Sequence, residues 1–145
     1  LDRALRALSM REHSERELVE KLGRAGFDER EIAYAMGKLS DYRLVDDAAF
    51  AEKWAASRAR RGLGPFRIRQ ELRQKGVDAR SANAALLKID EEASLEAATR
   101  LAEKHLSRGG ANALRRAADA LKRRGFDYDT IHRALSAAKR RMNAQ

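Results

Sequence analysis

The side chains of this sequence that are best suited to a chemical task are arginines and lysines. Residues 57–77 hold seven Lys or Arg against a single acid. A guanidinium group presents its N–H donors in a fixed fork that matches a phosphate, so a one-signed cluster indicates contact with a polyanion. Helical spacing places nine cations on outward faces or in the adjoining loop. They are Arg58, Arg60, Arg61, Arg67, Arg69, Arg73, Arg115, Lys122 and Arg123.

The positive charge is unevenly distributed along the chain. The formal net charge is +9 and the isoelectric point is near 10.3. Residues 1–45 hold nine basic and nine acidic side chains, residues 46–90 ten and six, and residues 91–145 twelve and seven. A field of this sign attracts polyanions, of which nucleic acid is the commonest. The excess charge therefore belongs to the second and third parts of the chain.

Other chemistry has little support in the sequence. There is no cysteine, which excludes disulfides and thiolate metal sites. His13, His105 and His132 are scattered without ligand spacing, and we expect each to lie at the surface or near a helix cap. No nucleophile elbow, P-loop or dinucleotide fingerprint occurs. We therefore predict a non-enzyme without metal or cofactor, and a cytoplasmic protein, since no membrane span or signal peptide is visible.

A glycine-containing turn recurs three times and sets the organisation of the chain. It reads Gly26-Phe27-Asp28, then Gly76-Val77-Asp78, then Gly125-Phe126-Asp127. Glycine suits the left-handed position that ends a helix, and aspartate caps the helix that follows. The recurrence predicts three three-helix units over residues 1–45, 46–90 and 91–145. The first helix is already under way at Leu1, so we expect the native first unit to start earlier.

Apolar residues at helical spacing complete an all-α prediction of about nine helices. Units of this size are marginal alone, so we expect them to pack in tandem as an elongated, repeat-like array. Ser14 and Glu17 form a capping box, and Trp54 is predicted to be a core residue rather than a base-stacking platform. The predicted core of the first unit is Ala4, Leu5, Leu8, Leu18, Leu22, Ile32, Ala35, Met36 and Leu39. Its counterparts later in the chain include Ile68, Leu72, Ala82, Ala85, Leu86, Ile89, Ala117, Leu121, Ile131, Ala134, Leu135 and Ala138.

Three-helix units also describe helix-turn-helix proteins that read duplex DNA. In those proteins the third helix presents Arg, Asn or Gln to base edges. Here the third helices are sparse in such residues, and the cations lie mostly on the middle helices. Sequence-independent, salt-sensitive phosphate binding is favoured, while a duplex-binding helix-turn-helix regulator and a passive scaffold stay open as alternatives.

Two long stretches resemble the RecX regulatory family. They are Leu44–Glu52 (LVDDAAFAE) and Ser57–Val77 (SRARRGLGPFRIRQELRQKGV), of which Gly62–Leu72 is the most specific part. The opening Ala4–Leu8 (ALRAL), with Arg11–Ser14 (REHS), is similar to that family's first repeat. The third unit resembles the family more loosely.

The resemblance implies a modulator, usually an inhibitor, of the RecA recombinase. Such proteins bind RecA–DNA filaments and restrain filament growth, ATP hydrolysis, strand exchange and repressor cleavage. On this reading the nine cations would contact RecA or DNA. We expect a monomer with two partners, the RecA filament and nucleic acid bound through its phosphates, and no membrane partner.

Overall fold

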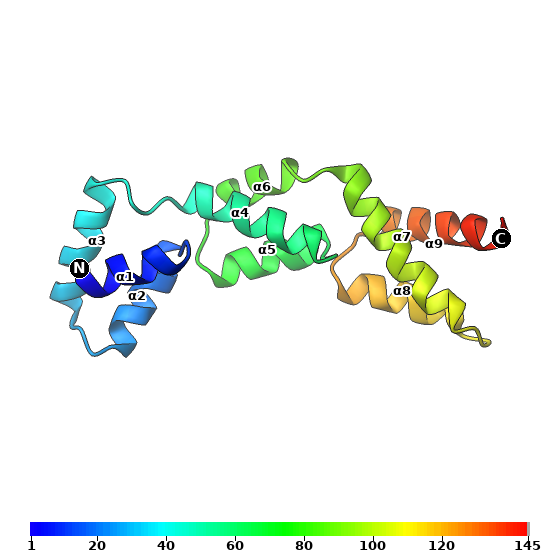
Figure 1. Cartoon of the computed structure of the whole chain (residues 1–145), viewed down its shortest axis with the longest axis horizontal. Helices are drawn as coiled ribbons and strands as arrows, with labels where there is room; N and C mark the ends of the chain where they lie inside the picture. The colour runs from blue at the N-terminus through cyan, green and yellow to red at the C-terminus, as the bar shows by residue number, and fades with distance from the viewer. Residues whose placement is uncertain (145) are drawn as a thin grey trace. The chain divides into compact units, whose positions relative to one another are not determined.

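Nine α-helices and no strand make up residues 1–144, which are the residues that this computed structural model describes (Figure 1). The helices are α1 (Asp2–Met10), α2 (Glu15–Arg24), α3 (Glu29–Asp41), α4 (Asp47–Arg60), α5 (Pro65–Gln74), α6 (Ala79–Leu87), α7 (Glu91–Ser107), α8 (Ala113–Arg123) and α9 (Tyr128–Asn143). The all-α prediction is confirmed. Gln145, the last residue of the third predicted unit, lies outside the described residues.

Short polar side chains start the helices where the sequence predicts. The Ser14 hydroxyl accepts a hydrogen bond from the Glu17 backbone N–H at 3.2 Å, and the Glu17 carboxylate accepts one from the Ser14 N–H at 3.1 Å. Asp28 and Glu31 form the same capping box before α3. Each box satisfies backbone donors that the first turn of a helix leaves unpaired, which fixes where the helix begins.

The three recurring glycines end α2, α5 and α8 in the left-handed region. Their φ angles are 95° at Gly26, 79° at Gly76 and 94° at Gly125. An L side chain rarely adopts such angles, so glycine is the residue that allows these sharp turns.

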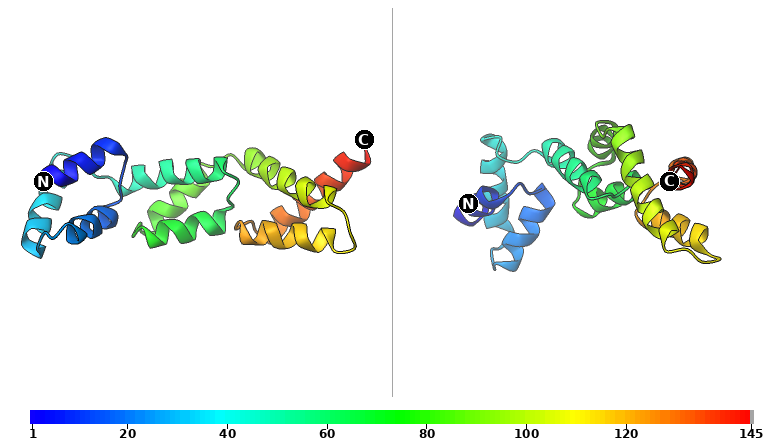
Figure 2. Two further views of the ribbon diagram at one scale, coloured as in Figure 1. Left: turned by 60° about the horizontal axis from the view of Figure 1, so that its bottom comes forward. Right: turned by 45° about the vertical axis from the view of Figure 1, so that its right-hand side comes forward.

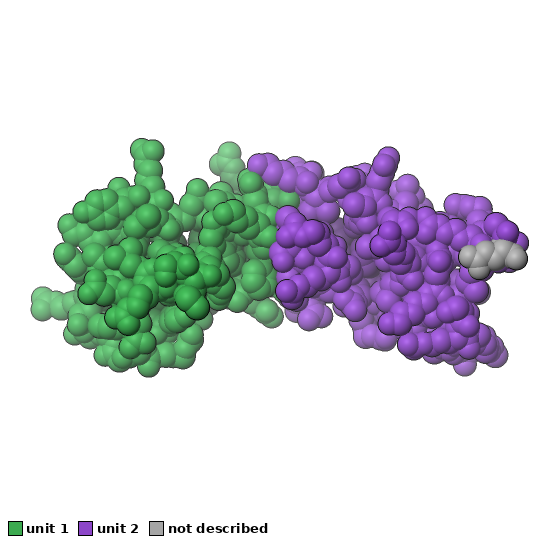
Figure 3. Space-filling model, in the orientation of Figure 1, with its two compact units in different colours: residues 1–54, 71–85 green, residues 55–70, 86–145 purple. Residues whose placement is uncertain are grey.

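The chain divides into two compact units (Figure 3). The first comprises residues 1–54 and 71–85, and its core includes a cluster from α1, α2 and α3. The second comprises residues 55–70 and 86–145. In it α7, α8 and α9 pack together, as both views of Figure 2 show, around a cluster centred on Ala98, Leu121 and Ala134.

Two side chains, Leu5 and His13, contradict the sequence prediction, while Ile89 and Trp54 are half-buried, as are the predicted core residues Leu8, Ile32, Met36, Leu86, Ile131 and Leu135. Leu5 is exposed, because Ala7 rather than Leu5 joins Ala4 in the core. Ile89 lies beyond the end of α6 and is only half-buried. His13 is buried rather than at the surface, with 4% of its area exposed. Trp54 is half-buried: its ring stacks on Phe50, and its Nε1 donates to the Glu71 carboxylate at 3.1 Å.

Two junctions of similar design lie within the compact units. In the first unit, the Ser14 hydroxyl donates to the Lys75 carbonyl at 2.8 Å, so the start of α2 contacts the turn after α5. In the second unit, the Gly64 N–H donates to the Arg124 carbonyl at 2.7 Å, so the start of α5 contacts the turn after α8. In both junctions the start of a middle helix is hydrogen-bonded to the glycine turn that follows the middle helix of the next three-helix unit.

Candidate nucleic-acid interface

A hollow of about 480 Å³ in the second compact unit gathers positive side chains from several helices. It is lined by Arg58, Leu63, Arg67, Leu101, Lys104, His105, Arg108, Ala120, Arg123 and Arg124. Six of these residues are Arg or Lys, and none carries a carboxylate. We call this hollow the basic hollow. Because like charges raise the electrostatic energy of an empty site, such an arrangement favours a bound anion.

Backbone hydrogen bonds hold two sides of the basic hollow together. The Phe66 N–H donates to the Gly125 carbonyl at 3.0 Å, beside the bond from Gly64 to Arg124. These bonds place Arg67, in the first turn of α5, next to the turn that carries Arg124. A Cβ added to Gly64 would lie 2.4 Å from the Gly125 carbonyl carbon, so the approach requires glycine at position 64.

His105 brings an unsatisfied polar atom to the same hollow. Its Nδ1 is buried and has no hydrogen-bond partner among residues 1–144. Burial lowers the pKa of His105, and the nearby cations Arg108, Lys104 and Arg123 lower it further. A bound anion would reverse this effect, because it would stabilise the protonated imidazole.

The structure brings together three of the nine predicted contact residues, namely Arg58, Arg67 and Arg123. The exposed residues Arg60, Arg61, Arg115 and Lys122 do not line the hollow. The guanidinium of Arg69 lies 5.8 Å from the centre of the Phe66 ring. Arg73 belongs to the other compact unit.

Sequence reasoning missed three cations of the basic hollow. Arg124 directly precedes Gly125, and its place in the recurring turn could have indicated it. Lys104 and Arg108 lie four residues apart at the end of α7. Cations there also complement the helix dipole, so their spacing alone does not reveal a shared site with α5 and α8.

Three family models match this chain. They describe the first, second and third three-helix domains of RecX, and they match residues 1–39, 46–86 and 91–135. The chain belongs to the RecX family.

Relatives and solved structures agree with this assignment to the RecX family. A protein named regulatory protein RecX from Halorhodospira halophila is 39% identical, covering 94% of this chain and 86% of the relative. Another of that name from Stenotrophomonas maltophilia is also 39% identical, over 92% and 83% of the two chains. The crystal structure of RecX from Lactobacillus salivarius superposes with a TM-score of 0.84 at 27% identity, covering 95% and 93% of the chains.

The basic hollow is built from the second and third RecX domains. Arg58 and Arg67 belong to the match with the second domain, and Arg123 to the match with the third. Across the described residues, no helix is long and apolar enough to cross a membrane, and no group of His, Asp or Glu side chains could hold a metal ion.

Proposed function

We propose that this chain is a non-enzymatic regulator that binds RecA–DNA filaments as a monomer. Through this binding it inhibits filament growth, ATP hydrolysis, strand exchange and co-protease activity. The observation that carries the proposal is the basic hollow: six cations without a carboxylate, in a chain of the RecX family. The chemistry of the hollow suits phosphates of the nucleic acid in the filament.

The basic hollow fits phosphate better than it fits a base edge. Its cations come from the ends of four helices and converge on one space, whereas base readout needs side chains that project from one element into a groove. Binding is then independent of sequence and sensitive to salt. Arg60, Arg61, Arg69, Arg115 and Lys122 are proposed as further contacts in the same compact unit, and Arg73 as a contact in the other unit.

The test is the ATPase activity of RecA on single-stranded DNA during titration with this protein. We expect the wild-type chain to slow ATP hydrolysis at substoichiometric amounts. Arg67→Glu combined with Arg123→Glu should weaken the inhibition, because both side chains line the basic hollow. The slope of log affinity against log salt should fall by about 2, since each lost phosphate contact removes about one unit.

A charge-matched control is available on α1. Arg3→Glu combined with Arg6→Glu changes the net charge equally, at exposed residues outside the hollow. This control should inhibit RecA as the wild type does, and circular dichroism should show equal helicity for both double variants. Equal inhibition by the wild type and the Arg67/Arg123 variant would contradict the proposal. Protection of one duplex sequence with no effect on the ATPase would instead identify a duplex-binding regulator.

A further inference from the structure

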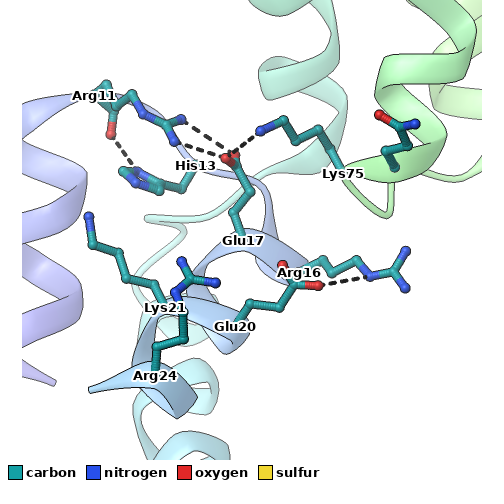
Figure 4. Close-up of a pocket in the computed structure, with 9 residues that line it drawn as sticks. Arg11, His13, Arg16, Glu17, Glu20, Lys21, Arg24 and Lys75 are labelled. Atoms are coloured by element: carbon teal, nitrogen blue, oxygen red, sulfur yellow. Dashed lines mark hydrogen bonds and ion pairs between the residues drawn. The ribbon is translucent and has the colours of Figure 1, made fainter.

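A second hollow, in the first compact unit, gathers four cations from residues 1–45, whose net charge is zero, and Lys75 from the second predicted unit (Figure 4). Its volume is about 290 Å³, and polar side chains dominate its walls. It is lined by Arg11, His13, Arg16, Glu17, Glu20, Lys21, Arg24, Gln74 and Lys75. Five cations and two carboxylates leave an excess of three positive charges there.

Two of the five cations have no acidic partner. The Glu17 carboxylate accepts hydrogen bonds from Arg11 and from Lys75, each at 2.9 Å, and Glu20 pairs with Arg16 at 3.5 Å. Lys21 and Arg24 make no ion pair within residues 1–144, and Figure 4 shows both reaching from α2 along the same side of the hollow. Lys21 and Arg24 therefore carry two of the three excess charges, and the third remains where Arg11, Arg16 and Lys75 share two carboxylates.

His13 adds a buried polar group to the same wall. Its Nδ1 lies 3.0 Å from the Arg11 carbonyl oxygen, and because a carbonyl only accepts, Nδ1 carries the proton. Burial lowers the pKa of His13, and the positive charges of Arg11 and Lys21 lower it further, while Glu17 opposes them. The ring is therefore neutral near pH 7 and faces a site whose excess charge is positive.

We propose that this hollow binds a phosphate group, with Lys21 and Arg24 as its charged contacts and His13 beside them. Phosphate suits the site better than a single carboxylate does, because it carries up to two negative charges and more acceptor oxygens. The phosphate can be a free inorganic ion or part of a nucleic-acid backbone. This site lies in the first RecX domain and is separate from the basic hollow.

The test is an NMR titration of the whole chain with inorganic phosphate, at constant ionic strength maintained with sodium chloride. We expect saturable shifts of the His13 ring signals and of the Lys21 and Arg24 amides. The pKa of His13 should rise when phosphate binds, because the anion stabilises the imidazolium form. A second titration, with a short single-stranded oligonucleotide, distinguishes the sources: shifts with both ligands identify a backbone site, and shifts with phosphate alone identify a site for the free ion.

Lys21→Glu combined with Arg24→Glu should weaken phosphate binding at least tenfold, since each charged hydrogen bond contributes about that factor or more. Arg3→Glu combined with Arg6→Glu is the matched control in the same domain and should leave the affinity unchanged. Unchanged affinity in the Lys21/Arg24 variant, or equal shifts with chloride alone, would overturn the proposal. RecA inhibition is not part of this readout, so its outcome and that of the proposed function are separable.

Discussion

Glu17 is the residue whose replacement tests the first junction most directly. Burial raises the pKa of its carboxyl, but hydrogen bonds from Arg11, Lys75 and the Ser14 backbone outweigh burial and lower the pKa from 4.5 to about 2. A pKa shift of this size corresponds to about 3 kcal/mol of stabilisation before solvent screening is considered, at roughly 1.4 kcal/mol per pKa unit. Arg11 is half exposed, and solvent screens that pair. We therefore expect Glu17→Gln to cost about 2 kcal/mol at pH 7.

The cost of Glu17→Gln should depend on pH in a defined direction. Because the folded-state pKa of Glu17 is lowered, its charge stabilises the fold above pH 4.5, and this contribution is lost as pH falls towards 2. The difference in free energy of unfolding between wild type and Glu17→Gln should therefore have its largest value at pH 7 and be close to zero at pH 2. The introduced glutamine amide can still accept the hydrogen bond from the Ser14 N–H, so the variant removes mainly the charge.

Trp54, the single tryptophan, provides a fluorescence signal at the first junction with which this prediction can be tested. The Lys75 ammonium lies 4.9 Å from the centre of the Trp54 ring, so Trp54 fluorescence reports unfolding around the junction. Urea unfolding followed at this signal, between pH 2 and pH 7, gives the difference at each pH. Glu20→Gln is the control: Glu20 is exposed and its pair within α2 is worth less than about 0.5 kcal/mol. A cost for Glu17→Gln that stays constant with pH, or equals that of Glu20→Gln, would refute the reasoning.

Three further predictions concern Gly64 at the second junction, the Ser14 cap of α2 and His105 in the basic hollow. Gly64→Ala should lower stability by about 1–3 kcal/mol, because the added Cβ collides with the facing turn. Gly37→Ala, in the open middle of α3, should raise stability by about 0.5–1 kcal/mol. Thermal unfolding measures the effect of both variants. Ser14→Ala should cost about 1–2 kcal/mol in urea unfolding, since it removes both the helix cap and the bond to Lys75. The pKa of His105 should lie below 6.5 in the free chain and rise when single-stranded DNA is added, as measured by NMR.

Helix boundaries could be predicted because local chemistry determines them. Asp46, Asp78 and Asp127 each accept hydrogen bonds from backbone N–H groups two or three residues further on, as their positions before apolar stripes indicate. A capping interaction spans about one turn, so the sequence within that turn is sufficient to recognise it.

Features that join distant parts of the chain could not be predicted in the same way. His13 is buried because it lies in the loop before α2, at the junction where Ser14 meets Lys75, 61 residues later. The basic hollow likewise combines Arg58 with residues of α7 and α8 that follow it in the chain by more than forty positions. Hydrophobic spacing also predicted Leu5 in the core, whereas Ala7 joins Ala4 there and Leu5 is exposed.

The two junctions use different hydrogen-bond donors at equivalent positions in the sequence. Ser14 and Gly64 both lie four residues before the first buried residue of a middle helix, Leu18 and Ile68. Ser14 uses a hydroxyl and tolerates a Cβ, whereas Gly64 uses its own N–H and has no room for a Cβ. Ala113 lies four residues before Ala117, but it is the first residue of α8, whose N-cap is Asn112.

Alanine satisfies neither form of the junction. It lacks the hydroxyl that the Ser14 form requires, and its Cβ would occupy the space that the Gly64 form leaves for the facing backbone. Ala113 therefore reproduces neither of the two contacts seen in this chain. Exchanging residues between the junctions should fail for the same reason: Gly64→Ser introduces the colliding Cβ, and Ser14→Gly removes the donor. Each junction thus depends on the residue type at one position, although both fix the start of a helix on the same kind of turn.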